Sequence, residues 1–135
     1  MVRTFALLFG IVFLAVGALG FVPGIAEPAT HEGVTMTHGS AMLLGLFPVN
    51  TLHNVVHILF GLWGLMSYRS VGGSIGYFRG VAVIYALFTV LGLLPQTQTL
   101  FGLVPLHGND VWLHAALALV AAYFGFVHRE TTVTV

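Results

Sequence analysis

Four long apolar segments constrain the fold of this chain more than any other feature. They cover residues 5–22, 51–68, 77–94 and 110–127. A helix needs about 20 mostly apolar residues, and about 17 at the least, to cross a membrane. Each segment is continuous, without the alternation of a membrane strand, and a helix satisfies its own backbone hydrogen bonds in lipid. The sequence therefore predicts an all-α protein, a four-helix transmembrane bundle formed by a single domain of residues 1–135.

The composition excludes most classes of soluble protein. Hydrophobic residues make up 58% of the chain and charged residues only 6%, whereas soluble domains carry about 25% charged residues. With 4 Lys and Arg residues in total, the chain lacks the basic stripe that a nucleic-acid partner requires. It contains 0 Cys, which excludes disulfides, thiolate metal sites and cysteine catalysis. The lipid bilayer is therefore the first partner that the composition predicts.

The arginines predict the orientation of the spans. With four spans, every arginine falls on the same side of the membrane: Arg3, Arg69, Arg79 and Arg129. The two longer loops, residues 23–50 and 95–109, contain no Arg or Lys. Basic residues stay on the cytoplasmic side. We therefore expect both termini in the cytoplasm and the two longer loops outside.

The second half of the chain resembles the first half, which indicates two helix–loop–helix repeats. The sequence Gly-Leu-Phe-Pro at residues 45–48 is similar to Gly-Leu-Val-Pro at residues 102–105, an offset of 57. The same offset relates His57 to His114. Each copy contains two spans and so keeps the same orientation, which predicts a parallel repeat.

The segments before the second and fourth helices also share a pattern. Short apolar runs at residues 41–47 and 99–104 are too short to span, so we expect them to lie on the membrane surface or to re-enter it. Pro48 and Pro105 end these runs. Polar residues follow that can cap the next helix: Asn50 or Thr51, and Asn109 or Asp110.

Small residues predict where helices approach closely. Gly61 and Gly64 form a short patch on the second helix. The fourth helix carries a longer stripe with helical spacing: Ala118, Ala121, Ala122 and Gly125. These faces are expected inside the bundle or against another subunit.

Four ionisable side chains are predicted in the outer half of the bundle. His53 and His57 are four residues apart and share one face of a helix, as do Asp110 and His114. His57 and His114 would lie about 9 Å below the starts of their helices. Ionisable groups inside a membrane are costly, which makes these four functional candidates.

Three interpretations of this cluster stay open. The first is structural, with histidines that form hydrogen bonds across helices. The second is a Zn or Cu site, because imidazole and carboxylate suit these ions; its ligands would be His53, His57, Asp110 and His114. The third is haem or chlorin binding, with His57 and His114 as axial ligands. A separate candidate surface metal site comprises three residues of the first outer loop: His31, Glu32 and His38.

One stretch resembles a known family. Residues 44–57 read Leu-Gly-Leu-Phe-Pro-Val-Asn-Thr-Leu-His-Asn-Val-Val-His and are followed by Gly-Leu-Trp-Gly at residues 61–64. This pattern, with the related one at residues 103–114, resembles a bacterial family of small four-span membrane proteins catalogued as a domain of unknown function. The resemblance covers nearly the whole chain. It implies a four-helix integral membrane fold and assigns no reaction.

Three functions follow as alternatives. The small size, the lack of a nucleophile–base constellation and the small-residue faces favour a non-enzymatic accessory or scaffold subunit of a larger membrane complex. Its partners would be other subunits or a second copy of itself. The alternative is a haem-, chlorin- or metal-binding membrane protein that uses His57 and His114. A small transporter is the third, and the lack of an ionisable relay in the inner half weighs against it.

Overall fold

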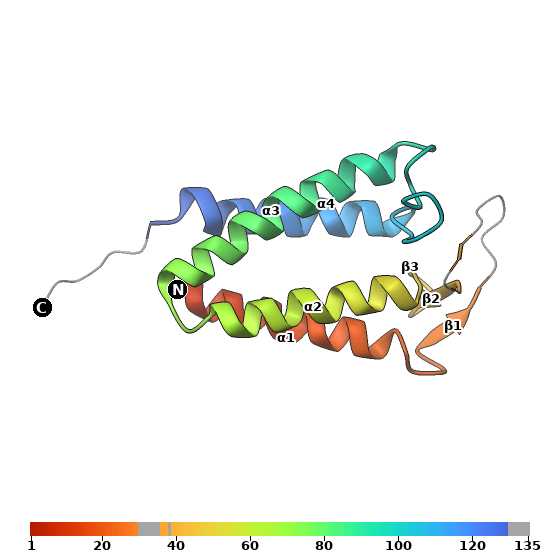
Figure 1. Ribbon diagram of the computed structural model, residues 1–135, viewed down its shortest axis with the longest axis horizontal. Helices are drawn as coiled ribbons and strands as arrows, with labels where there is room; N and C mark the ends of the chain where they lie inside the picture. The colour runs from red at the N-terminus through yellow and green to blue at the C-terminus, as the bar shows by residue number, and fades with distance from the viewer. Residues whose placement is uncertain (30–35, 38, 130–135) are drawn as a thin grey trace, which may run out of the picture.

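Helices dominate the computed structural model, which describes residues 1–29, 36–37 and 39–129. Figure 1 shows the α-helices of this described part running side by side as two antiparallel pairs, α1 with α2 and α3 with α4. The N-terminus and the α2–α3 turn lie at one end of the helices (Figure 1). The helix bounds are α1 Val2–Leu19, α2 Thr51–Ser67, α3 Val71–Leu93 and α4 Asn109–Ala122, and the π-helix η1, Tyr123–Val127, continues α4.

Three helices of the described part are long and apolar enough to cross a membrane: α1, α3, and α4 together with η1. Helix α1 starts and ends three residues before the predicted segment, and α3 begins at Val71, six residues before its predicted start. Helix α2 has 17 residues and covers all but the last residue of its predicted span. The large apolar residues on the outside of the helices include Ile11, Leu59 and Leu119. A helix pair with such outer faces is typical of a membrane protein.

A small three-stranded sheet lies at the other end of the molecule and corrects the prediction of an all-α fold. Strands β1 (Ala26–Pro28), β2 (Ala41–Leu43) and β3 (Phe47–Val49) pair in the antiparallel order β1-β2-β3. The Leu46 N–H donates to the Leu43 carbonyl oxygen at 3.0 Å, which closes the turn between β2 and β3. Its central residues, Leu44 and Gly45, have φ angles of 54° and 68°. Residues 41–47 therefore form a hairpin because the chain reverses at this left-handed turn.

Glycines bring the two helices of the first pair into close contact. A Cβ atom on Gly64 would lie 2.8 Å from the Gly10 Cα, and one on Gly10 would lie 2.9 Å from the Leu65 nitrogen. Gly61 faces the same helix, where a Cβ would lie 2.7 Å from the Leu14 nitrogen. The predicted small patch of α2 thus lies against α1, at a distance that only residues without a side chain allow.

The predicted stripe on α4 is split between two environments. Ala118 and Ala121 belong to the buried core, whereas Ala122 is only partly buried. Gly125 lies against α3, where a Cβ would approach the Arg79 nitrogen to 2.9 Å. The stripe therefore packs against α3 and the aromatic core within the described chain.

The start of α2 confirms one predicted cap, and the start of α4 contradicts the other. The Asn50 side chain accepts a hydrogen bond from the His53 N–H at 2.8 Å. Helix α4 instead begins after Gly108, which has no side chain to cap it. Asn109 is the first residue of α4, and its amide donates to the Leu46 carbonyl oxygen at 3.1 Å. Asn109 therefore does not cap α4 because its side chain is bound to the β2–β3 turn.

Candidate metal centre

The four predicted ionisable residues lie at the end of α2 and α4 that is nearest the sheet. His53 and Asp110 belong to the first turns of these helices, and His57 and His114 follow one turn later. All four side chains are buried, with Asp110 only 1% exposed. Each helix starts within four residues of the proline of a Gly-Leu-x-Pro sequence. The sequence therefore places two ionisable pairs at equal depth on neighbouring helices.

Three of the four residues converge on a single point. The His114 Nε2 atom lies 3.3 Å from the Asp110 Oδ2 atom, and the His53 Nε2 atom lies 4.0 Å from the same oxygen. One ligand atom from each of His53, Asp110 and His114 lies within 4.8 Å of the others. This separation suits a single ion placed between them. His57 is not in this group, although its ring centroid is 4.5 Å from that of His53.

Backbone carbonyls fix the orientation of two histidine rings. The Pro48 carbonyl oxygen lies 3.2 Å from His53 Nδ1, and the His53 carbonyl oxygen lies 3.2 Å from His57 Nδ1. A carbonyl oxygen can only accept a hydrogen bond, so each Nδ1 atom carries the proton. In a neutral ring the Nε2 atom then holds a lone pair. The His53 lone pair is therefore available to a cation, as in metal-binding histidines whose other ring nitrogen is bound to a backbone carbonyl.

The cluster contains buried polar atoms without a hydrogen-bond partner in the described part of the chain. They are His53 Nε2, Asp110 Oδ2 and His114 Nδ1. Such atoms are rare, and each costs about 1–3 kcal/mol when it is left unpaired. While Asp110 is ionised, His53 Nε2 and Asp110 Oδ2 both present lone pairs, so neither donates to the other. A cation bound between them would stabilise both.

A small cavity lies beside the cluster. Its volume is about 80 Å³, and its lining includes His53, His57 and His114, with apolar side chains such as Phe88 and Val104. Pockets for ligands larger than a few atoms measure about 300–1,000 Å³. A haem or chlorin ring between His57 and His114 would require the helices to separate. An ion with one small additional ligand requires no such movement.

Two contacts around the cluster were not predicted from the sequence. The ring of Tyr85, from α3, meets the His114 ring edge-on at a centroid distance of 4.9 Å. The Asn50 amide donates to the Leu103 carbonyl oxygen at 2.7 Å and so joins the start of α2 to the loop before α4. Neither contact has a local sequence signal. The residues of the predicted surface metal site, His31, Glu32 and His38, lie outside the described residues.

These features define a class: a mostly helical protein with helices able to cross a membrane and a buried histidine–aspartate cluster at one end of them. The chain matches the family model described as a domain of unknown function (DUF4383) over residues 3–127, and it belongs to this family. This match confirms the family resemblance at the level of a domain of unknown function. No curated protein and no solved structure matches the chain.

Proposed function

We propose that this protein is a four-span integral membrane protein that binds one divalent transition-metal ion, Zn²⁺ or Cu²⁺, at His53, Asp110 and His114. The observation that carries the proposal is the pair of buried lone pairs on His53 Nε2 and Asp110 Oδ2, which face each other at 4.0 Å. Nitrogen and carboxylate donors are the ligands that these ions take. Three protein ligands leave a fourth position open, and the adjacent cavity can hold a water molecule there.

The packing of α2 supports the fourth span. Gly17 of α1 lies against Asn54, where a Cβ would come within 2.7 Å of the Asn54 oxygen, and Gly10 lies against Leu65. Helix α2 therefore follows α1 from one end to the other and shares its depth. Its 17 residues extend over about 26 Å, close to the hydrocarbon thickness of about 30 Å. If α1 crosses the membrane, α2 crosses it too.

The backbone supports the proposal of two parallel repeats. Gly45 and Gly102, which are 57 residues apart, have φ angles of 68° and 84°. The preceding residues, Leu44 and Phe101, have φ angles of 54° and 59°. Two arginine bonds have acceptors at the same offset: Arg3 Nε donates to the Tyr68 carbonyl oxygen and Arg79 Nε donates to the Gly125 carbonyl oxygen, each at 2.8 Å. Tyr68 and Gly125 are again 57 residues apart.

A role as an accessory or scaffold subunit is compatible with this metal site. The apolar outer faces of the helices would suit partner helices, but lipid covers such faces equally well. The buried cluster, in contrast, contains donor atoms that neither lipid nor a partner helix reaches. We therefore propose metal binding ahead of the role as an accessory or scaffold subunit.

Metal binding can be tested on the protein purified in a mild detergent. After treatment with a chelator, it is titrated with Co²⁺, whose visible absorption reports tetrahedral nitrogen and oxygen ligands, and Zn²⁺ is then added as a competitor. We expect one ion per chain. The variants His53→Ala, Asp110→Asn and His114→Ala should each weaken binding by at least about tenfold, or about 1.4 kcal/mol.

The matched control is His128→Ala, which removes a histidine that lies beyond η1, away from the cluster. It should bind Co²⁺ as the unmodified protein does. Binding that is equal in all variants, or absent from the unmodified protein, would overturn the proposal.

A further inference from the structure

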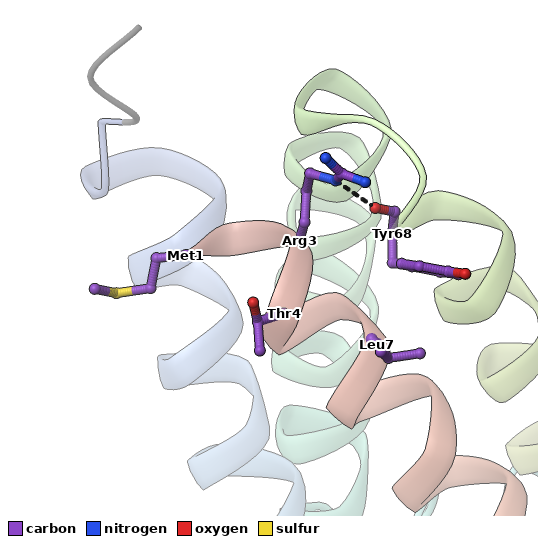
Figure 2. A pocket seen from close by; sticks show the side chains of 5 residues that line it. All are labelled: Met1, Arg3, Thr4, Leu7 and Tyr68. Carbon is purple, nitrogen blue, oxygen red and sulfur yellow. Dashed lines mark hydrogen bonds between the residues drawn. The ribbon is translucent and has the colours of Figure 1, made fainter. Parts of the chain in front are cut away.

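A second pocket lies at the end of the helices opposite the metal centre. It has a volume of about 320 Å³ and is lined by Met1, Arg3, Thr4, Leu7 and Tyr68. Figure 2 shows that these residues come from the first turns of α1 and from the end of α2. The pocket is open to its surroundings and combines a cation, a hydroxyl group and apolar side chains. It is independent of the proposed metal ion.

One hydrogen bond holds the arginine of this pocket in place. Arg3 Nε donates to the Tyr68 carbonyl oxygen at 2.8 Å, as the dashed line in Figure 2 shows. The two terminal amino groups of Arg3 make no hydrogen bond or ion pair with the described residues. A guanidinium group that is oriented through Nε presents these remaining N–H donors as a fork, which matches the geometry of phosphate oxygens. The Thr4 hydroxyl, one residue further along α1, adds a further donor.

The charges near the pocket favour an anion. The acidic residues of the described chain are Glu27, in β1, and Asp110, in the first turn of α4. Both elements lie at the sheet end of the helices (Figure 1). Arg69 directly follows Tyr68 at the same end of the molecule but does not line the pocket. Among the described residues, no carboxylate lies at the Arg3 end of the helices.

The depth of the pocket identifies the source of the anion. Arg3 and Thr4 are exposed at the helix end, Leu7 lies one turn further along α1, and Leu8 and Ile11 continue an exposed apolar surface toward the membrane centre. Tyr68 is a residue type that concentrates at the membrane–water interface. A phospholipid has its phosphate at this level and its acyl chain along such an apolar surface. A soluble phosphate compound would leave Leu7, Leu8 and Ile11 without a partner.

We propose that this pocket binds the headgroup of an anionic phospholipid, with the phosphate held by Arg3 and Thr4 and one acyl chain packed along α1. The proposal rests on the placement of α1 across a membrane and does not depend on metal binding. An anionic lipid is favoured over a zwitterionic one because its net charge is attracted by the Arg3 guanidinium.

The test is native mass spectrometry of the detergent-purified protein with phosphatidylglycerol, phosphatidylcholine of the same chain length, or inorganic phosphate. We expect one molecule of phosphatidylglycerol to bind at least about fivefold more tightly than phosphatidylcholine, a difference of about 1 kcal/mol. Inorganic phosphate should not displace it. Arg3→Gln should weaken lipid binding by about tenfold, and Thr4→Val should weaken it by a smaller factor.

The matched control is Arg69→Gln, which removes an equal charge from an exposed residue at the same end of the molecule. Arg69→Gln should retain most of the lipid binding. Equal losses in Arg3→Gln and Arg69→Gln would overturn the proposal, because they would mean attraction by overall charge. Displacement by inorganic phosphate, or equal binding of both lipids, would also contradict it. If Arg3→Gln does not fold, Thr4→Val takes its place in the comparison. Thr4→Val should then lose more lipid binding than Arg69→Gln, and equal losses would overturn the proposal.

Discussion

At the scale of single residues, His53 has the most constrained position in the proposed metal centre. Its Nδ1 proton is bound to the Pro48 carbonyl oxygen, and its Nε2 lone pair faces Asp110. Rotation of the ring would break the first interaction. The ring is therefore oriented before any metal arrives, and such preorganisation reduces the free energy spent on ordering the ligands.

The two histidines of α2 should differ in their effect on metal binding. His57 lies outside the group of ligand atoms, although it contacts the His53 ring. We predict that His57→Ala lowers Co²⁺ affinity by less than about tenfold, and that His53→Ala lowers it by more than that factor, because a lost ligand costs more than about 1.4 kcal/mol. Equilibrium dialysis followed by elemental analysis measures both. A larger loss in His57→Ala would instead favour the His57/His114 pair expected from the sequence repeat.

The sequence predicted which side chains form this cluster but not how they are held. The four-residue spacing on two helices and the repeat offset were sufficient to bring His53, Asp110 and His114 together. The Pro48 carbonyl could not be predicted as a partner, because its position depends on the β2–β3 hairpin. The exclusion of His57 from the ligand group also depends on ring orientation, which helical periodicity does not specify.

At the scale of elements, the contact between α1 and α2 depends on glycine at both helices. We predict that Gly64→Val lowers the free energy of unfolding by about 1–3 kcal/mol, since its new atoms would overlap α1 in a packed interface. The Cβ alone would lie 2.8 Å from the Gly10 Cα. Unfolding in mixed detergent micelles, followed by circular dichroism, measures this change.

The control for this substitution is Gly76→Ala on α3, where an added Cβ meets nothing within 4 Å. It should leave the free energy of unfolding unchanged or raise it by up to about 1 kcal/mol, because alanine favours a helix. If Gly64→Val and Gly76→Ala have the same free energy of unfolding, α1 and α2 do not pack as closely as described.

Asn50 joins two elements through the two ends of its amide. Its oxygen caps α2, and its nitrogen donates to the Leu103 carbonyl oxygen. Asn50→Ser keeps a capping oxygen and loses the second bond, so we predict a loss of about 1 kcal/mol in the free energy of unfolding. Asn50→Ala loses both and should cost about 2 kcal/mol. The same unfolding measurement compares the two variants, and equal losses would mean that the capping bond contributes nothing.

The helices were easier to predict than the sheet for a physical reason. Long apolar runs predict helices because lipid requires internal backbone hydrogen bonds. The run at residues 41–47 has no polar–apolar alternation and so gave no strand signal. Its hairpin depends on Leu44 in a left-handed conformation, which a leucine adopts only when the surrounding structure supports it.

At the scale of the whole molecule, the orientation of the two helix pairs determines where both proposed sites lie. The sheet and the starts of α2 and α4 lie at one end of the helices, and the N-terminus and the α2–α3 turn lie at the other (Figure 1). The metal centre therefore belongs to the first end and the Arg3 pocket to the second. If the arginine end faces the cytoplasm, the lipid site lies in the inner leaflet. The metal centre then lies just beneath the outer surface. This orientation requires an even number of spans, because an odd number would place the two termini on opposite sides of the membrane.

The absence of cysteine allows this topology to be tested with single introduced cysteines. Thr51→Cys places a thiol at the exposed start of α2, and Gly72→Cys places one near the α2–α3 turn, where an added Cβ meets nothing within 4 Å. We predict that a membrane-impermeant maleimide labels Thr51→Cys in intact cells and labels Gly72→Cys only after the cells are opened. The reason is that α2 separates the two positions by nearly the thickness of the membrane. Labelling of both from one side would mean that α2 does not cross, and the reverse pattern would place the arginines, and with them the lipid pocket, outside.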